Sequence, residues 1–146
     1  AVTGMVAGLG TITPASGFVG PGGGLIIGLS AGVVCYYATG YIKRTLKIDD
    51  SLDVFPVHGV GGILGTLLTG VFASNALGVF SGQEDIAIGA QVSIQAIGIL
   101  SAICYTAVVT YVILKVTDAV VGNRVDEEDE MQGLDLVSHD ERGYDL

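Results

Sequence analysis

The chain has 146 residues, of which 50% are hydrophobic, and its mean hydropathy is +0.65. Charged residues make up 14% of the sequence, well below the roughly 25% of an ordinary soluble domain. The net charge of −9 is concentrated after Asn123, where nine acidic residues face two arginines. This composition excludes an ordinary soluble domain. The excess of acidic residues also argues against nucleic-acid binding, which needs a basic surface.

Charged residues are absent from three long windows, residues 1–42, 54–83 and 86–114. Each window exceeds the roughly 20 apolar residues that cross a bilayer as a helix. The first window accommodates two crossings, because GFVGPGGG (17–24) breaks it near the middle. We therefore predict four membrane spans, near 2–16, 22–42, 54–74 and 89–114. Since backbone groups in lipid must bond internally, these spans are expected to be helices, and the fold class is an all-α polytopic membrane bundle.

Basic residues mark the expected orientation. Lys43, Arg44 and Lys47 lie between the second and third spans, whereas the 75–88 loop contains no lysine or arginine. The positive-inside rule places the 43–52 loop in the cytoplasm and the 17–24 and 75–88 loops outside. The chain then divides into a transmembrane region, 1–122, and a cytoplasmic tail, 123–146.

Several smaller features give expectations about packing. Three glycine pairs have small-xxx-small spacing, which predicts close helix contacts at Gly4/Gly8, Gly28/Gly32 and Gly61/Gly65. Cys35 and Cys104 fall inside spans and are expected to be small buried residues. Pro14 is expected to end the first span. That span is short, and AVTGMVAGLG is no signal peptide, so we expect further protein before Ala1.

His58 is the one histidine inside a predicted span, in DVFPVHGVGG (53–62). Its position leaves three interpretations open: a histidine bonded to a neighbouring helix for packing, a metal or haem ligand, or a residue of a pore or proton relay. Val54 lies four residues earlier and would share its face, which predicts an apolar lining. Asp53 precedes Pro56 by three residues and is the expected N-cap of this helix.

Three separated stretches resemble the ammonium transporter family. IKRTLKIDDSLDVFPVHGVGGILGTLLTGVFA (42–73) is similar to the family's tenth helix and the loop before it. GLGTITPASGFVGPGGGLIIGLSAG (8–32) resembles the eighth and ninth helices. GLDLVSHDERGYDL (133–146) resembles the tail motif G-L-D-x-x-x-H-G-E-x-A-Y, with Asp140 in place of its glycine and Gly143 in place of its alanine.

The resemblance implies part of an eleven-helix fold built from inverted repeats, assembled as a homotrimer with one hydrophobic pore per subunit. It places His58 as the second of two pore histidines, with Val54 beside it and Asp53 as an acid at the inner mouth. The first histidine would belong to a missing N-terminal half. In the tail it implies regulatory roles for the matching motif residues: Gly133, Leu134, Asp135, His139, Glu141 and Tyr144. A cytoplasmic PII-type signalling protein is a possible partner.

The function implied is transport of ammonium or ammonia across the cell membrane (the inner membrane of a bacterium) through a pore with a histidine proton-relay site. No enzymatic activity and no cofactor or metal are expected. One alternative is an ammonium sensor, in which the same membrane fold is coupled to signalling. A further alternative from another class is a membrane metalloprotein with His58 as ligand.

Overall fold

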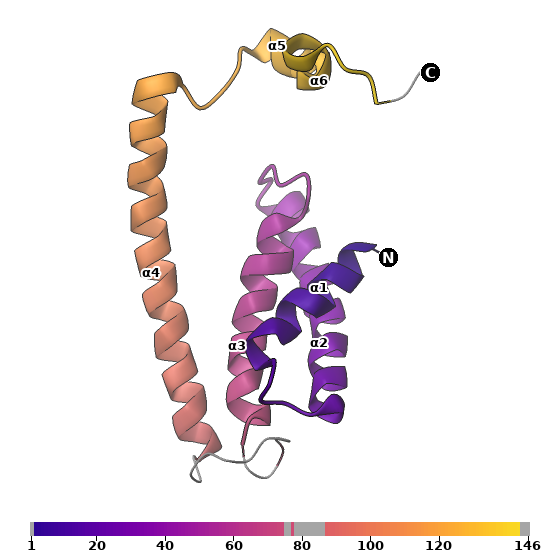
Figure 1. Cartoon of the computed structure of the whole chain (residues 1–146), viewed down its shortest axis with the longest axis vertical. Coiled ribbons are helices and arrows are strands. Elements are labelled where there is room, and N and C mark those ends of the chain that lie inside the picture. Colours follow the sequence, from indigo (N-terminus) through magenta and orange to yellow (C-terminus); the bar gives the residue numbers. More distant parts are fainter. Residues whose placement is uncertain (1, 75–76, 78–86, 144–146) are drawn as a thin grey trace. The chain divides into compact units, whose positions relative to one another are not determined.

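The computed structural model describes residues 2–74, 77 and 87–143. Within these residues the chain is helical and contains no strand, which confirms the all-α prediction (Figure 1). The chain forms two compact units, residues 1–102 and 103–146. The elements in order are α1 (Val2–Ile12), the 3-10 turn η1 (Thr13–Ala15), α2 (Pro21–Gly40), the π-helical η2 (Tyr41–Thr45) and η3 (Phe55–Val60), α3 (Gly61–Phe72), α4 (Ile88–Val121), α5 (Glu127–Gln132) and α6 (Leu134–His139).

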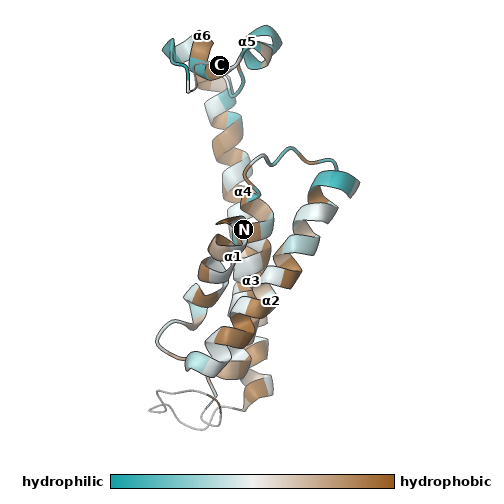
Figure 2. Cartoon of the chain, turned by 90° about the vertical axis from the view of Figure 1, so that its right-hand side faces the viewer, coloured by the Kyte–Doolittle hydropathy of each residue, from teal (hydrophilic) through white to brown (hydrophobic). Residues whose placement is uncertain are grey.

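Three helical stretches are long and apolar enough to cross a membrane. They are α2 with η2 (Pro21–Thr45, 25 residues), η3 with α3 (Phe55–Phe72, 18 residues) and α4 (34 residues). The first helical stretch, Val2–Ala15, is apolar but shorter. Figure 2 shows hydrophilic colour on the C-terminal end of α2 and on α5 and α6, with mostly apolar helix elsewhere. The helices overlap the four ranges expected from the charge-free windows.

Proline and glycine set the helix boundaries in the N-terminal half. Helix α1 ends at Ile12, and Pro14 sits in the tight turn η1 that follows, as expected. Gly17 adopts a φ of +85°, a conformation that residues with a Cβ avoid. Helix α2 then begins at Pro21, whose missing N–H costs nothing in the first turn. The break between the first two helices, residues 13–20, is therefore as long as the expected 17–24 and lies four residues earlier.

Helix α4 continues seven residues beyond the expected end of its span. Its 34 residues give a length of about 51 Å, against about 30 Å for the hydrocarbon core of a bilayer. The helix stops where Gly122 takes a φ of +78°. Asn123 secures this end, because its Nδ2 donates to the carbonyl of Leu114 at 2.8 Å. Most of the 75–88 loop lies outside the described residues.

The centre of the N-terminal unit is a close crossing of α1 with α2 and α3. Thr11 is fully buried, and its carbonyl packs directly against Gly65. A Cβ on Gly61 would lie 2.7 Å from Thr11 Oγ1 and 3.3 Å from Cys35 Sγ. The glycines of α3 therefore let backbone and small side chains approach where any larger residue would separate the helices.

The predicted glycine contacts are present at one of the three pairs. Gly61 and Gly65 form the crossing just described, whereas nothing lies within 4 Å of a Cβ built on Gly4, Gly8, Gly28 or Gly32. Cys35 is buried, as expected, but the expectation was wrong for Cys104, which is exposed. The reason is that α4 contains no buried residue in the described structure.

The crossing predicts a sharp difference between two neighbouring glycines. Gly65→Ala should lower the free energy of unfolding by about 1–3 kcal/mol, because the new methyl group would overlap the Thr11 carbonyl. Thermal unfolding of the purified full-length protein in detergent would measure this. Gly62→Ala is the matched control, since nothing lies within 4 Å of its Cβ position. Equal effects of the two substitutions would contradict the assignment.

Candidate functional site

His58 lies in the π-helical segment η3, on a face that the described chain leaves open. Its neighbours Pro56 and Val57 are buried, whereas His58 itself is exposed. Val54 and Phe55 are also open, at 52% and 59% exposure. The wider π turn occurs often at functional sites, where it re-aims side chains within a helix. An imidazole and two apolar side chains therefore line one uncovered face.

Helix α1 forms the wall beside this face. A Cβ on Gly10 would lie 3.9 Å from His58 Nδ1 and 4.0 Å from the carbonyl oxygen of Val57. On the same helical segment the ring of Phe55 lies over Gly59, with Cδ2 2.9 Å from the Cβ position of that glycine. Gly10 and Gly59 thus keep the surroundings of His58 and Phe55 free of further side chains.

Asp53 does not cap the helix, so that expectation was wrong. The cap is Asp50, whose Oδ1 accepts the N–H of Val54 and whose Oδ2 accepts the N–H of Phe55, both at 2.8 Å. Asp53 instead adopts a left-handed backbone, with a φ of +58°. The Asp53 carboxylate pairs with η2, where Oδ1 lies 2.7 Å from Lys43 Nζ.

The two carboxylates have different electrostatic tasks. Hydrogen bonds from the backbone of Phe55 and then of Val54 hold the pKa of Asp50 below its ordinary value of 3.8. Asp53 joins η2 to the start of η3 through Lys43, and Lys43 Nζ also donates to the Ser51 carbonyl at 3.5 Å. Asp50 thus organises the first turn and Asp53 closes the loop between the helices.

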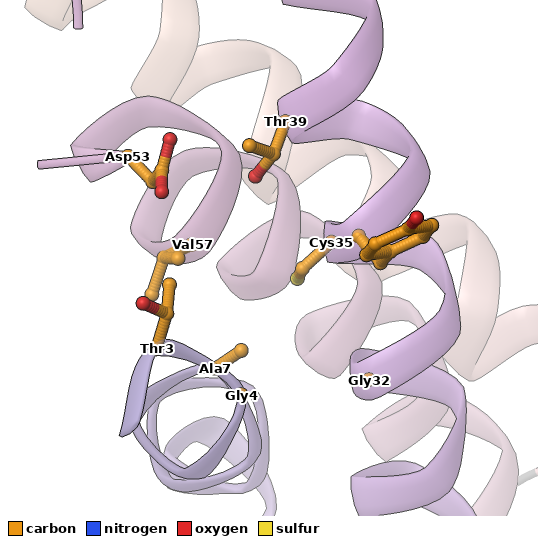
Figure 3. Close-up of a pocket in the computed structure, with 9 residues that line it drawn as sticks. Thr3, Gly4, Ala7, Gly32, Cys35, Thr39, Asp53 and Val57 are labelled. Atoms are coloured by element: carbon orange, nitrogen blue, oxygen red, sulfur yellow. The ribbon is translucent and has the colours of Figure 1, made fainter. Parts of the chain in front are cut away.

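A cavity of about 280 Å³ lies between α1, α2 and the start of η3 (Figure 3). Asp53 and Val57 contribute to its lining from one side, and Cys35 and Thr39 from α2. Thr3, Gly4 and Ala7 of α1 complete the near wall. Within the part of the chain that the structure describes, Asp53 lines this cavity and His58 does not.

The tail contains two short helices separated by Gly133, which has a φ of +95°. Arg124 pairs with Glu130 through two contacts of 2.6 and 2.8 Å, which fixes the acidic helix α5 against the preceding segment. Leu134 and Asp135 open α6, and His139 ends it.

Asp140 occupies the left-handed position that stops α6, with a φ of +51°. Its N–H donates to the Leu136 carbonyl at 3.1 Å, and the N–H of Glu141 donates to the Asp135 carbonyl at 2.9 Å. Glycine adopts this left-handed conformation without strain, which accounts for the glycine at this position of the tail motif G-L-D-x-x-x-H-G-E-x-A-Y. Tyr144 lies outside the described residues.

Three contributors to the site were not foreseen from the sequence: Asp50, Lys43 and Gly10. The capping role of Asp50 could have been considered from the sequence, because a short acidic residue just before a helix is a common cap. The sequence has three such acids in DDSLD (49–53), however, and only the path of the loop selects among them. No group of three His, Cys, Asp or Glu side chains gathers in the described ranges as a metal site would.

Apolar helices of membrane-crossing length, a glycine-based crossing and a histidine on an open helix face define a multi-pass membrane protein. The sequence profile of the Ammonium Transporter Family matches residues 1–144, and the chain belongs to this family.

Curated relatives support the same family over the whole chain. A putative ammonium transporter of Methanothermobacter thermautotrophicus is 43% identical over 100% of this chain and 36% of its own length. An ammonium transporter of Aquifex aeolicus is 47% identical over 99% of the chain and 34% of its own length. The chain thus spans about a third of the length of these relatives.

A solved structure has the same fold. A protein described as Sensor Amt Protein superimposes with a TM-score of 0.81 and 34% identity, over 94% of this chain and 33% of that one. The arrangement of α1 to α3 is therefore that of a segment of an ammonium transporter fold.

The capping role of Asp50 can be tested by amide hydrogen exchange. Asp50→Ala should accelerate exchange of the Val54 and Phe55 amides, because both lose their acceptor. Asp49→Ala is the matched control, since Asp49 accepts a weak 3.4 Å bond from the Ser51 hydroxyl and not from the Val54 or Phe55 amide. Equal acceleration in both variants would refute the cap.

Acidification should have the same effect as the Asp50 substitution. Because the pKa of Asp50 is lowered in the folded protein, its carboxylate stabilises the turn fully at pH values above the ordinary pKa of 3.8. This contribution is lost as the pH falls through the lowered folded-state pKa. Protection factors at Val54 and Phe55 should therefore fall below about pH 4 in the natural protein, and should be independent of pH over that range in Asp50→Ala.

Asp140 gives a pair of opposite predictions for α6. Asp140→Gly should increase amide protection across α6 by roughly twofold, because glycine adopts a positive φ without strain. Asp140→Ala should decrease it, since alanine lacks the short polar side chain that tolerates this conformation. Nuclear magnetic resonance exchange measurements on the tail would show both; a gain in both variants would contradict the strain argument.

Proposed function

We propose that this chain is the C-terminal part of an ammonium transporter and that His58 is one of two imidazoles in its pore. The observation that carries the proposal is the exposure of His58 on a π-helical turn with Val54 and Phe55. A histidine used for packing within this chain would be covered by α1 or α2. The open face instead fits a lumen completed by the N-terminal half of the same protein.

The chemistry of such a lumen follows from hydration. An ammonium ion loses its water shell at great cost in an apolar pore, whereas neutral ammonia crosses it easily. A neutral imidazole accepts a hydrogen bond on one ring nitrogen and donates one from the other. An ammonium ion would give up its proton at this site, the paired imidazoles would take up and relay that proton, and neutral ammonia would cross beside His58. Val54 would keep water from the site.

Asp53 is assigned to the inner mouth of this pathway. Its carboxylate borders the cavity between α1, α2 and η3, and Lys43 offsets its charge at 2.7 Å. A neutralised pair at this position would admit a departing molecule without trapping a cation. The alternative use of Asp53 as a helix cap is removed by the hydrogen bonds to Asp50.

The remaining parts of the proposal concern assembly and regulation. The whole protein would form a homotrimer in the cell membrane, the inner membrane of a bacterium, with loop 43–52 and the tail in the cytoplasm. The tail motif would pack on the cytoplasmic face through Leu134 and its neighbours, with Gly133, Asp135, His139, Glu141 and Tyr144 setting its shape. A PII-type signalling protein would dock on the same face.

A second candidate function is ammonium sensing. It is favoured by the solved structure described as Sensor Amt Protein, which has this fold at a TM-score of 0.81. Uptake separates the two functions: a transporter restores growth on low ammonium to cells that lack their own transporters, and a pure sensor does not.

Substitution of His58 tests the pore assignment. In the full-length protein reconstituted in vesicles, His58→Asp should lower the ratio of ammonium to potassium uptake by roughly tenfold or more. A fixed carboxylate offsets part of the dehydration cost that excludes cations. Cys104→Ser, on an exposed position of α4, serves as the control for insertion and yield. An unchanged ratio of ammonium to potassium uptake in a correctly folded His58→Asp variant would contradict a role of His58 in the pore.

A further inference from the structure

The loop between η2 and η3 is closed by a partly buried ion pair. Lys43 Nζ lies 2.7 Å from Asp53 Oδ1 and also donates to the Ser51 carbonyl at 3.5 Å. The side chain of Asp53 is 18% exposed and that of Lys43 is 38% exposed. Water and salt therefore screen this pair less than a pair on the surface, whose contribution to stability is small. The contact ties the end of one membrane-crossing stretch to the start of the next.

The backbone of Asp53 begins the helical stretch that contains His58. Its carbonyl accepts the N–H of Val57 at 3.0 Å. Val57 is 3% exposed and packs in a buried cluster with Ala7 and Cys35, and Figure 3 shows Asp53 and Val57 on the same side of the cavity. Since His58 follows Val57 directly, the position of the imidazole depends on where the Asp53 turn places Val57.

The conformation of this turn needs support from its surroundings. Asp53 has a φ of +58°, and a residue other than glycine keeps such a conformation only where neighbouring contacts hold it. The turn leads into the π-helical segment η3, which spans Phe55–Val60. A π turn is wider than an α-helical turn, so the side chains along it point in different directions from those of a regular helix. The direction of His58 is therefore sensitive to how the stretch begins.

We propose that Lys43 is a positioning residue for His58. Its ion pair holds the left-handed turn at Asp53, the Asp53 carbonyl holds Val57, and Val57 places the imidazole that follows it. This inference rests on the proposed function of His58 in the pore and goes beyond it, because that function uses Lys43 only to offset the charge of Asp53.

Ammonium uptake by the full-length protein in vesicles tests this role. Lys43→Met should lower uptake by roughly tenfold, because a misplaced group loses most of its effect. Lys43→Arg should retain most of the uptake, since a guanidinium also pairs with a carboxylate. Arg44→Met is the matched control, because Arg44 lies beside Lys43 in η2 and pairs with no carboxylate in the described ranges. It should change uptake by less than about twofold.

A double variant separates positioning from charge balance. Lys43→Met with Asp53→Asn removes both charges and leaves the net charge unchanged, and asparagine tolerates the left-handed backbone. If Lys43 only offsets the charge of Asp53, this variant should recover the uptake that Lys43→Met loses. If Lys43 positions His58, uptake should stay low. Recovery to the level of the unsubstituted protein would overturn the proposal, and so would equal losses in Lys43→Met and Arg44→Met.

Nuclear magnetic resonance gives a readout that does not depend on transport. The imidazole signals of His58, assigned with a His58→Gln variant of the histidine-labelled full-length protein, should shift in the double variant. Amide exchange at Val57 should accelerate by about threefold or more. Unchanged His58 signals and unchanged Val57 exchange would overturn the positioning role even where uptake is low. If the unsubstituted protein takes up no ammonium, the proposed function fails, whereas these two measurements still decide whether Lys43 places His58.

Discussion

The structure depends on one close approach, between the backbone of α1 at Thr11 and the glycine face of α3. Lipid tails are as apolar as leucine, so burial alone gives membrane helices little reason to associate. Close contact between helices supplies that reason, and here it is possible because Gly61 and Gly65 leave room for Thr11. The same crossing carries Gly10 to within contact range of His58. Packing and the candidate site thus share a single geometric origin.

Much of the helical organisation was predictable because charge is so costly in lipid. Helices α1 to α4 overlap the gaps between charged residues, whereas α5 and α6 lie in the charged tail, and the prolines located two of the boundaries. Packing was less predictable. Three glycine pairs have the same small-xxx-small spacing, but within the described residues only Gly61 and Gly65 make close contacts. Spacing alone does not reveal which helix face has a partner.

The candidate site shows a second limit of sequence reasoning. His58 was identified because an imidazole is conspicuous in an apolar segment, and its neighbour Val54 followed from helical spacing. The cap was assigned to Asp53 and is Asp50, because the choice depends on the left-handed backbone of Asp53, which the local sequence does not predict. The π-helical form of residues 55–60 was not foreseen either. In a π-helix each hydrogen bond joins residues five apart instead of four, and no residue type specifies this pattern.

The C-terminal end of α4 has a mechanical consequence. Helix α4 continues for two turns past Leu114 to Val121, and Asn123 then bonds back to Leu114 and to the Asp118 carboxylate. These two hydrogen bonds connect the residue after Gly122 to the last turns of α4. Insertion of one residue into 115–121 would turn everything beyond by about 100° and raise it by about 1.5 Å. The rotation introduced by this short spacer, and not only its length, therefore sets the direction in which the tail leaves α4.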